Sequence, residues 1–322
     1  MLAIVLTCAL AACGSSGHAG HTGSSLASES QLASGQTPFL TFRDASGQEI
    51  KLDRKPERIV MLNTELLDLL YQAGGAAVGR STAPGYTPPE AARGVQEVGQ
   101  INSVNMEEIF NLKPDLVIGQ PLFHAKLRTQ FQEANIPFSV LTVKSAQDIS
   151  SNGKLMGQLA DKEEAVTASL QRMEEQIKTM IGKLPQGKEP TFAMLTVMGN
   201  SPSIQKGSSI ALDVAAGLHM KNVAEGLQVG PMGAVPFSME KLAELNPDYL
   251  FWTVHGTEDS GLETIKKQLE GNPAWSSIKP VKEGKFYMLP SRWFVNNPGF
   301  ELDKSYAYLA QIVYPESFGG KP

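Results

Sequence analysis

The pattern of apolar and polar positions repeats once along the chain, 133 residues apart. Residues 105–118 and 238–251 each begin with apolar positions spaced by three and four, which predicts a short amphipathic helix. In both copies a proline, Pro114 or Pro247, stops the helix, and the apolar run after it predicts a buried strand. The two segments therefore predict the same helix-turn-strand unit.

This repeat predicts two similar α/β lobes. A unit that returns only once, after so long an interval, does not fit a solenoid, whose repeats are short and stack on one another. Two α/β lobes are the simplest account. Ligands of parallel α/β sheets bind beyond the carboxyl ends of the strands. We therefore expect a cleft between the lobes, lined by the residues that follow Ile118 and Phe251.

The remaining pattern completes both lobes with alternating strands and helices. A hairpin is expected over residues 39–56, with its turn at 44–47. The first half then predicts strands at 58–62, 78–80 and 138–143, and helices at 65–73 and 125–134. The second half predicts strands at 191–198 and 285–289, and helices at 208–216, 262–269 and 302–313.

One longer helix is predicted between the halves. After Asp161, a candidate amino-terminal cap, apolar residues recur at steps of three and four over about twenty positions. They are Val166, Leu170, Met173, Ile177, Met180 and Ile181. A helix of that length extends about 30 Å. A single stiff connector of this kind predicts limited hinge motion.

Composition and charge narrow the class of partner. A chain of 322 residues is long enough for two domains with their own cores. The formal net charge is −5 and no long run of Lys or Arg occurs, whereas nucleic-acid binding needs clustered cations. No nucleic-acid partner is expected.

The amino-terminal residues resemble a bacterial lipoprotein signal. Residues 1–12 are apolar but too short to span a bilayer, and Leu10-Ala11-Ala12-Cys13 resembles a lipobox that leaves Cys13 lipidated. No Lys or Arg precedes the apolar run, although such signals begin with one. The alternative is a buried strand with an idle cysteine. We expect a signal with lipobox at 1–13, a flexible Gly/Ser-rich tether at 14–38, an N-terminal lobe at 39–160, a connecting helix at 161–184 and a C-terminal lobe at 185–322.

In this order, several short motifs resemble the substrate-binding lipoproteins of bacterial ABC importers for ferric siderophores, haem and cobalamin. They are Pro56-Glu57-Arg58-Ile59-Val60, the two repeated units, Gly182 and Pro185 after the long helix, and the segment 282–287. The resemblance implies an α/β fold of two Rossmann-like lobes, with central parallel sheets, joined by a single long α-helix. It implies a binding protein without enzymatic activity or intrinsic cofactor, anchored by lipid on the extracytoplasmic face of the membrane. The implied ligand is an iron complex, a ferric siderophore or haem, which the cleft captures and delivers to a permease dimer.

In that family an acidic residue on each lobe docks onto arginines of the permease, and the matching positions here are Glu107 and Glu240. Both are predicted in the first turn of a repeated helix, so the pair suits a symmetric permease dimer. A helix start also favours Glu for its dipole alone, by a few tenths to about 1 kcal/mol. Recurrence in both copies favours docking.

Two histidines are candidates for the cleft, because His124 and His255 follow the two repeated strands. Facing imidazoles could ligate a haem iron or donate hydrogen bonds to an anionic siderophore. The segment 252–256 resembles the strand end where Gram-positive haem proteins of the family carry their haem histidine. Those proteins also have a methionine where this chain has Asn102, and Met232 is the substitute that we would test.

A siderophore would instead require cations and aromatic rings, because ferric catecholates and carboxylates are anionic and their planar groups stack. Two of the candidates have plain alternatives: Tyr86 as an ordinary loop residue and Trp293 as a half-buried corner. The full set of ligand-binding candidates is Arg80, Tyr86, His124, Lys206, Trp252, His255, Arg292 and Trp293.

Three other functions compete with this one. A cobalamin or metal-ion binding protein would have a related fold, but a zinc or manganese site needs three or four converging ligands and the histidines are few. A lipid-anchored enzyme would need a catalytic motif, and G-x-S-x-G and H-E-x-x-H do not occur in the sequence. An adhesion or scaffold lipoprotein would be favoured by a featureless cleft.

Overall fold

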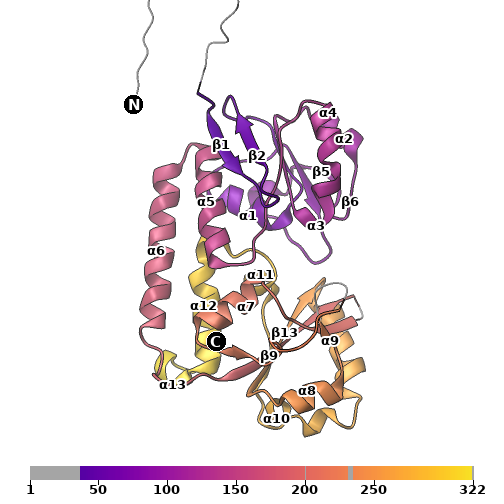
Figure 1. Cartoon of the computed structure of the whole chain (residues 1–322), viewed down its shortest axis with the longest axis vertical. Coiled ribbons are helices and arrows are strands. Elements are labelled where there is room, and N and C mark those ends of the chain that lie inside the picture. Colours follow the sequence, from indigo (N-terminus) through magenta and orange to yellow (C-terminus); the bar gives the residue numbers. More distant parts are fainter. Residues whose placement is uncertain (1–36, 200, 231–234, 321–322) are drawn as a thin grey trace, which may run out of the picture. The chain divides into compact units, whose positions relative to one another are not determined.

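Each half of the chain forms an α/β lobe around its own sheet (Figure 1). The computed structural model describes residues 37–199, 201–230 and 235–320. The expected hairpin is present as β1 (Leu40–Arg43) and β2 (Glu49–Leu52), which pair antiparallel. None of the helices in the described ranges is long and apolar enough to cross a membrane.

The N-terminal lobe has the strand order β6-β5-β4-β3-β7-β8. All neighbours are parallel except β5 and β6, which are antiparallel. The strands are β3 (Ile59–Met61), β4 (Gly79–Thr82), β5 (Gln96–Gln100), β6 (Ser103–Val104), β7 (Leu116–Gly119) and β8 (Phe138–Val140). The helices are α1 (Thr64–Gln72), α2 (Met106–Asn111), α3 (Pro121–His124), α4 (Arg128–Glu133) and α5 (Ala146–Ala160).

The C-terminal lobe has the strand order β12-β10-β9-β13-β14, with β11 also paired to β9. Its centre, β9 with β13 and β14, is parallel, but β10 folds back antiparallel on β9. The strands are β9 (Thr191–Met198), β10 (Ser201–Ile204), β11 (Lys221–Asn222), β12 (Val235–Pro236), β13 (Tyr249–His255) and β14 (Phe286–Met288). The helices are α7 (Ile210–Gly217), α8 (Met239–Leu245), α9 (Glu258–Ile265), α10 (Lys279–Lys282), α11 (Ser291–Phe294), α12 (Leu302–Val313) and α13 (Pro315–Phe318).

The repeated unit is confirmed in both lobes, as α2 with β7 and as α8 with β13, and the two copies lie in separate sheets. Each helix begins at a polar cap, because Asn105 Oδ1 accepts from the Glu107 amide at 3.0 Å and Ser238 Oγ from the Lys241 amide at 3.0 Å. Lys113 and Asn246, which precede the two prolines, both have left-handed backbone, with φ of 47° and 43°. The duplication therefore extends to the backbone turn.

The long connecting helix is α6 (Glu163–Ile181), and it begins two residues later than expected. Asp161 is not its amino-terminal cap: it ends the preceding helix α5 in a left-handed conformation, with φ of 60°. The apolar pattern did not single out α5, because several of its buried positions are small or polar, including Asn152, Gly153 and Gly157. The paired helices α5 and α6 run side by side (Figure 1).

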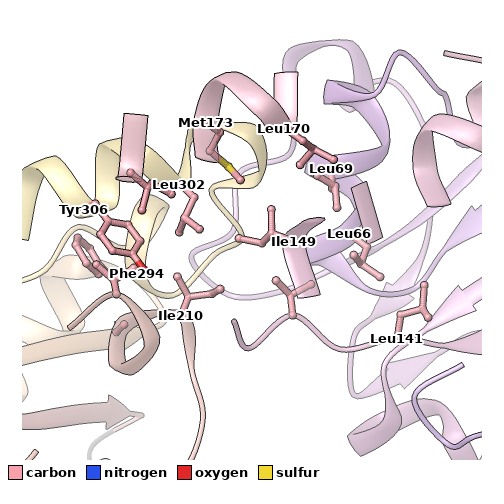
Figure 2. Packing of buried hydrophobic residues seen from close by; sticks show 14 of the residues in the cluster. Leu66, Leu69, Leu141, Ile149, Leu170, Met173, Ile210, Phe294, Leu302 and Tyr306 are labelled. Carbon is pink, nitrogen blue, oxygen red and sulfur yellow. The ribbon is translucent and has the colours of Figure 1, made fainter. Parts of the chain in front are cut away.

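A single hydrophobic cluster joins the two lobes (Figure 2). It combines Leu66 of α1 and Ile149 of α5 with Met173 of α6, and continues through Ile210 of α7 to Tyr306 of α12. Two further clusters fill the other faces of the sheets, one in each lobe. Since the shared cluster would have to repack during a wide swing of the lobes, the fold favours small hinge motions.

Candidate ligand-binding cleft

A cavity of about 660 Å³ lies between the two lobes and is lined by both of them. The N-terminal lobe contributes α1 and the loop 85–89 that follows β4. The C-terminal lobe contributes residues 256–258, directly after β13, together with α11 and the segment 296–301. The cavity therefore lies beyond the carboxyl ends of parallel strands. The prediction is confirmed for the residues after β13, but it is wrong for those after Ile118, because the N-terminal lobe lines the cavity with the loop after β4 and with α1 instead.

The lobes touch beside this cavity at two glycines, Gly85 and Gly256. A Cβ atom added to Gly85 would lie 2.0 Å from the Gly256 carbonyl oxygen. Both residues have positive φ, 75° and 139°, which glycine adopts without strain. Any side chain at position 85 would push the lobes apart at this point.

Asp68 and Tyr86 form a hydrogen-bonded pair on the cavity wall. The Tyr86 hydroxyl donates to Asp68 Oδ2 at 3.0 Å, and both residues line the cavity. Burial raises the pKa of Asp68 to about 6, although the Tyr86 hydrogen bond and the charge of Arg292 act in the opposite direction. Burial and the neighbouring Asp68 also raise the pKa of Tyr86, so its hydroxyl stays protonated.

Arg292 and Gln72, on the cavity wall, both contact the segment 298–301. The exposed Arg292 guanidinium lies 2.9 Å from Glu301, which also pairs with Lys304. Gln72 of the first lobe accepts from the Phe300 amide at 2.8 Å and donates to the Pro298 carbonyl at 3.3 Å. These hydrogen bonds tie α1 to the C-terminal lobe at the wall of the cavity.

Asn297 places a side-chain amide donor without a partner among the described residues on the cavity wall. Its side chain is 4% exposed and lines the cavity. Its Oδ1 accepts from the Gly299 amide at 2.8 Å, but its Nδ2 finds no acceptor among the described residues. A buried amide donor without a partner is costly, which makes it a candidate contact for a ligand oxygen.

Two of the three basic residues predicted for the cleft make hydrogen bonds or ion pairs elsewhere in their own lobe. Arg80 is 5% exposed, donates to the Ala92 carbonyl at 3.1 Å and pairs with Glu97 at 2.7 Å. Lys206 donates to the Leu227 carbonyl. Neither lines the cavity, because partners within its own lobe satisfy each of them. Arg292 lines it as predicted.

The two predicted histidines do not face each other. His124 is 1% exposed, and its Nδ1 accepts from the Gln120 amide at 3.0 Å, which turns the ring into the N-terminal lobe. Burial lowers the pKa of His124 to about 4, so the ring is neutral at pH 7. His255 is exposed at the end of β13, beside Gly256, and desolvation by the surrounding protein lowers its pKa. A ligand role for His255 stays a prediction.

Of the three predicted aromatic residues, only Tyr86 is among the residues that line the cavity. Tyr86 lines the cavity, whereas Trp252 is 3% exposed and packs against Phe286 in the core of the second lobe, with ring centroids 6.1 Å apart. Trp293 is partly buried against Tyr308, as the corner alternative describes. Trp252 is therefore a core residue, because strand alternation turns it away from the cleft.

Glu107 and Glu240 are exposed in the first turns of α2 and α8. The Ser238 hydroxyl donates to Glu240 at 3.0 Å, and hydrogen bonds from the Glu240 amide and Ser238 lower the pKa of this carboxyl. Both carboxylates are accessible to a partner. Cys13 and Met232, the predicted lipidation site and haem ligand, lie outside the described residues.

A second cavity, of about 220 Å³, lies between the amino ends of α5 and α7, near Ser145 and Ser209. Phe192, at the start of β9, lines it, so it is at the opposite end of the strands from the cleft. Asp213 already caps α5 there, accepting from the Ala146 amide at 2.8 Å. We therefore assign the ligand site to the larger cavity.

Sequence reasoning missed the acidic and amide groups of the cavity wall, namely Asp68, Gln72, Glu258, Asn296, Asn297 and Glu301. Asp68 and Gln72 could have been found, because they are polar positions four residues apart, on one face of a helix whose residues 66, 67, 69 and 70 are all leucine. No group of three or more His, Cys, Asp or Glu is placed to hold a metal ion within the part of the chain that the structure describes.

Comparison with known proteins agrees with this architecture. Residues 59–293 match the family model described as "Periplasmic binding protein". An uncharacterized ABC transporter substrate-binding lipoprotein, YvrC of Bacillus subtilis, is 27% identical over 87% of each chain. The iron-uptake system-binding protein of B. subtilis is 26% identical over 60% of each chain. The crystal structure of Staphylococcus aureus IsdE complexed with heme shares the fold, with a TM-score of 0.69 at 21% identity, covering 80% of this chain and 98% of IsdE. The chain therefore belongs to the periplasmic binding protein family.

Proposed function

We propose that this chain is the substrate-binding protein of an ABC importer, which captures an iron complex between its lobes and delivers it to a permease. The cavity lined by both lobes carries the proposal, since a ligand there would contact both and favour their closure. The relative named for iron uptake supports the class of ligand. Glu107 and Glu240 are the proposed contacts to the permease.

A lipid anchor at Cys13 is part of the same proposal. The sequence Leu10-Ala11-Ala12-Cys13 and the printed name of YvrC as a lipoprotein support it. The anchor would hold the protein on the extracytoplasmic face, next to its permease.

Haem is a second candidate ligand, because His255 is exposed at the end of β13 beside the interlobe contact. Its test is a spectral titration with hemin. A Soret shift that His255→Ala abolishes would support haem.

The main test is isothermal titration of the purified chain with ferrioxamine B, ferric enterobactin, hemin and cyanocobalamin. We expect one iron complex to bind with one-to-one stoichiometry, and Ser291→Trp, which fills the cavity wall, to abolish binding. Ser276→Trp, exposed on the same lobe, is the matched control. Binding of cyanocobalamin alone, or undiminished binding by the Ser291 variant, would refute the proposal.

A further inference from the structure

Carboxylates outnumber cations on the wall of the interlobe cavity. Asp68, Glu258 and Glu301 border it, against Arg292 as the one basic residue among the described residues of its lining. The Arg292 guanidinium is itself paired with Glu301 at 2.9 Å. The cavity therefore presents a net negative wall to a ligand near neutral pH.

Other nearby cations do not reverse this balance. Arg80 is paired with Glu97 and Lys206 donates to the Leu227 carbonyl, and neither lines the cavity. Lys304, also outside the lining, pairs with Glu301 alongside Arg292, so the three carboxylates still outnumber the two cations beside them. Of the residues beyond position 36 that lie outside the described ranges, Asn200 and 231–234 carry no charged side chain, and Lys321 is the next-to-last residue of the chain. An anionic ligand would meet repulsion, with no unpaired cation to compensate for it in the part of the lining that the structure describes.

The remaining polar lining suits neutral oxygen acceptors. It includes the amides of Asn296 and Asn297 and the hydroxyls of Thr257 and Ser291. Asn297 Nδ2 is buried and has no acceptor among the described residues. Amide and hydroxyl donors bind carbonyl oxygens without requiring a formal charge on the ligand.

We propose that the cavity selects a neutral or positively charged iron complex, of the ferric hydroxamate type, over anionic catecholate or carboxylate complexes. This inference rests on the proposed function. Three hydroxamates each carry one negative charge and neutralise ferric iron, and a pendant amine then makes the complex a cation. Three catecholates leave a trianion, which the carboxylates of the wall repel.

The test compares ferrioxamine B, a monocation, with ferrichrome, which is neutral, and ferric enterobactin, a trianion, by isothermal titration at low and high salt. We expect ferrioxamine B or ferrichrome to bind at least about tenfold more tightly than the trianion at low salt. Added salt should weaken binding of the monocation and narrow the difference between monocation and trianion, because it screens the wall.

Variants of Glu258 provide the decisive comparison. Glu258→Arg should weaken binding of ferrioxamine B about tenfold and strengthen binding of ferric enterobactin. Glu263→Arg, on the exposed side of α9 and outside the lining, makes the same charge change and should leave all three affinities within about twofold. Glu258→Gln should lie between wild type and Glu258→Arg.

The outcomes separate the two proposals. Tighter binding of ferric enterobactin than of both hydroxamates, or an equal effect of the Glu258 and Glu263 variants, would overturn the charge selection and leave an iron-binding function intact. Failure of all three complexes to bind, with binding of hemin, would overturn the charge selection alone. Failure of all three complexes and of hemin to bind the folded chain would overturn both proposals.

Discussion

Asp248 accepts two hydrogen bonds from Thr191, from its backbone amide at 2.9 Å and from its hydroxyl at 2.8 Å. Thr191 begins β9, and Asp248 directly precedes β13, the parallel neighbour of β9. In the first copy, Asp115 accepts from the amides of Glu57 and Arg58, both at 2.8 Å, just before β3. The repeated aspartate therefore fixes the register of the central parallel pair in each lobe.

Asp248→Ala should lower the free energy of unfolding by about 2–3 kcal/mol at pH 7, because it leaves the start of β9 without its charged acceptor. Burial acts to raise the pKa of Asp248, but hydrogen bonds from Lys279 and Thr191 outweigh it and lower the pKa to about 2. A depressed pKa stabilises the fold above about pH 4, and this stabilisation is lost as the pH falls toward 2. Urea titrations from pH 7 to pH 3 measure both effects. Asp259→Ala, at an exposed site, is the control. A loss of stability no larger than that of the control would contradict a stabilising role of the hydrogen bonds between Thr191 and Asp248.

Asp68→Asn should stabilise the ligand-free protein at pH 7.5 by about 1–2 kcal/mol, since a shift of about two pKa units, which already includes the Tyr86 hydrogen bond, costs at most ~3 kcal/mol and the side chain is only partly buried. The pKa of Asp68 is raised to about 6, so its ionisation opposes folding. This cost is complete above pH 6 and disappears as the pH falls toward 4.

Thermal unfolding of Asp68→Asn and wild type between pH 4 and pH 8 measures that difference. The gap should widen from pH 4 to pH 6 and then stay constant. A variant that is less stable than wild type throughout this range would show that the Asp68–Tyr86 pair stabilises the apo protein.

Gly85→Ala should weaken ligand binding at least about tenfold, because the added methyl group overlaps the Gly256 carbonyl and holds the lobes apart. The matched control is Gly47→Ala, which has a similar φ of 82° but open space around its Cβ position. Both variants should lose about 1–2 kcal/mol of stability from left-handed backbone strain. Calorimetric titration and thermal unfolding separate the two effects, and equal ligand affinities of the two variants would exclude this role of the contact.

Arg80→Ala should destabilise the N-terminal lobe by about 2–3 kcal/mol while leaving ligand affinity within about twofold, since the buried side chain bridges Ala92 and Glu97 and does not reach the cavity. Arg93→Ala removes an exposed ion pair with Glu90 and should cost less than about 1 kcal/mol. Urea unfolding with ligand titration of the folded variants tests this. A large loss of ligand affinity in a variant of native-like stability would show that Arg80 contributes to ligand binding.

Reversing Glu107 and Glu240 together to lysine should abolish ligand uptake by cells while the purified variant binds ligand normally. The control reverses Glu164 and Glu175, two exposed carboxylates on α6, with the same change in net charge. Uptake at the wild-type rate by the Glu107/Glu240 variant would rule out docking through these residues.

The repeat by itself determined much of the architecture of this protein. Helix and strand periods are local properties, so residues 105–118 and 238–251 predicted the duplicated unit, its two sheets and the end of the strands where the cleft lies. The long helix was equally visible. Only its start was misplaced, because α5 buries small and polar residues and gives a weak apolar pattern.

Tertiary structure alone decided which charges face the cleft. Arg80 is satisfied by Glu97 and Lys206 by the Leu227 carbonyl, whereas Asp68 and Glu301 reach the cavity from opposite lobes. Gly85 and Gly256 are distant in sequence and meet only when the lobes pack. Residue type gives a side chain its chemistry, but its partners, and thus its availability to a ligand, depend on contacts between segments that no local pattern encodes.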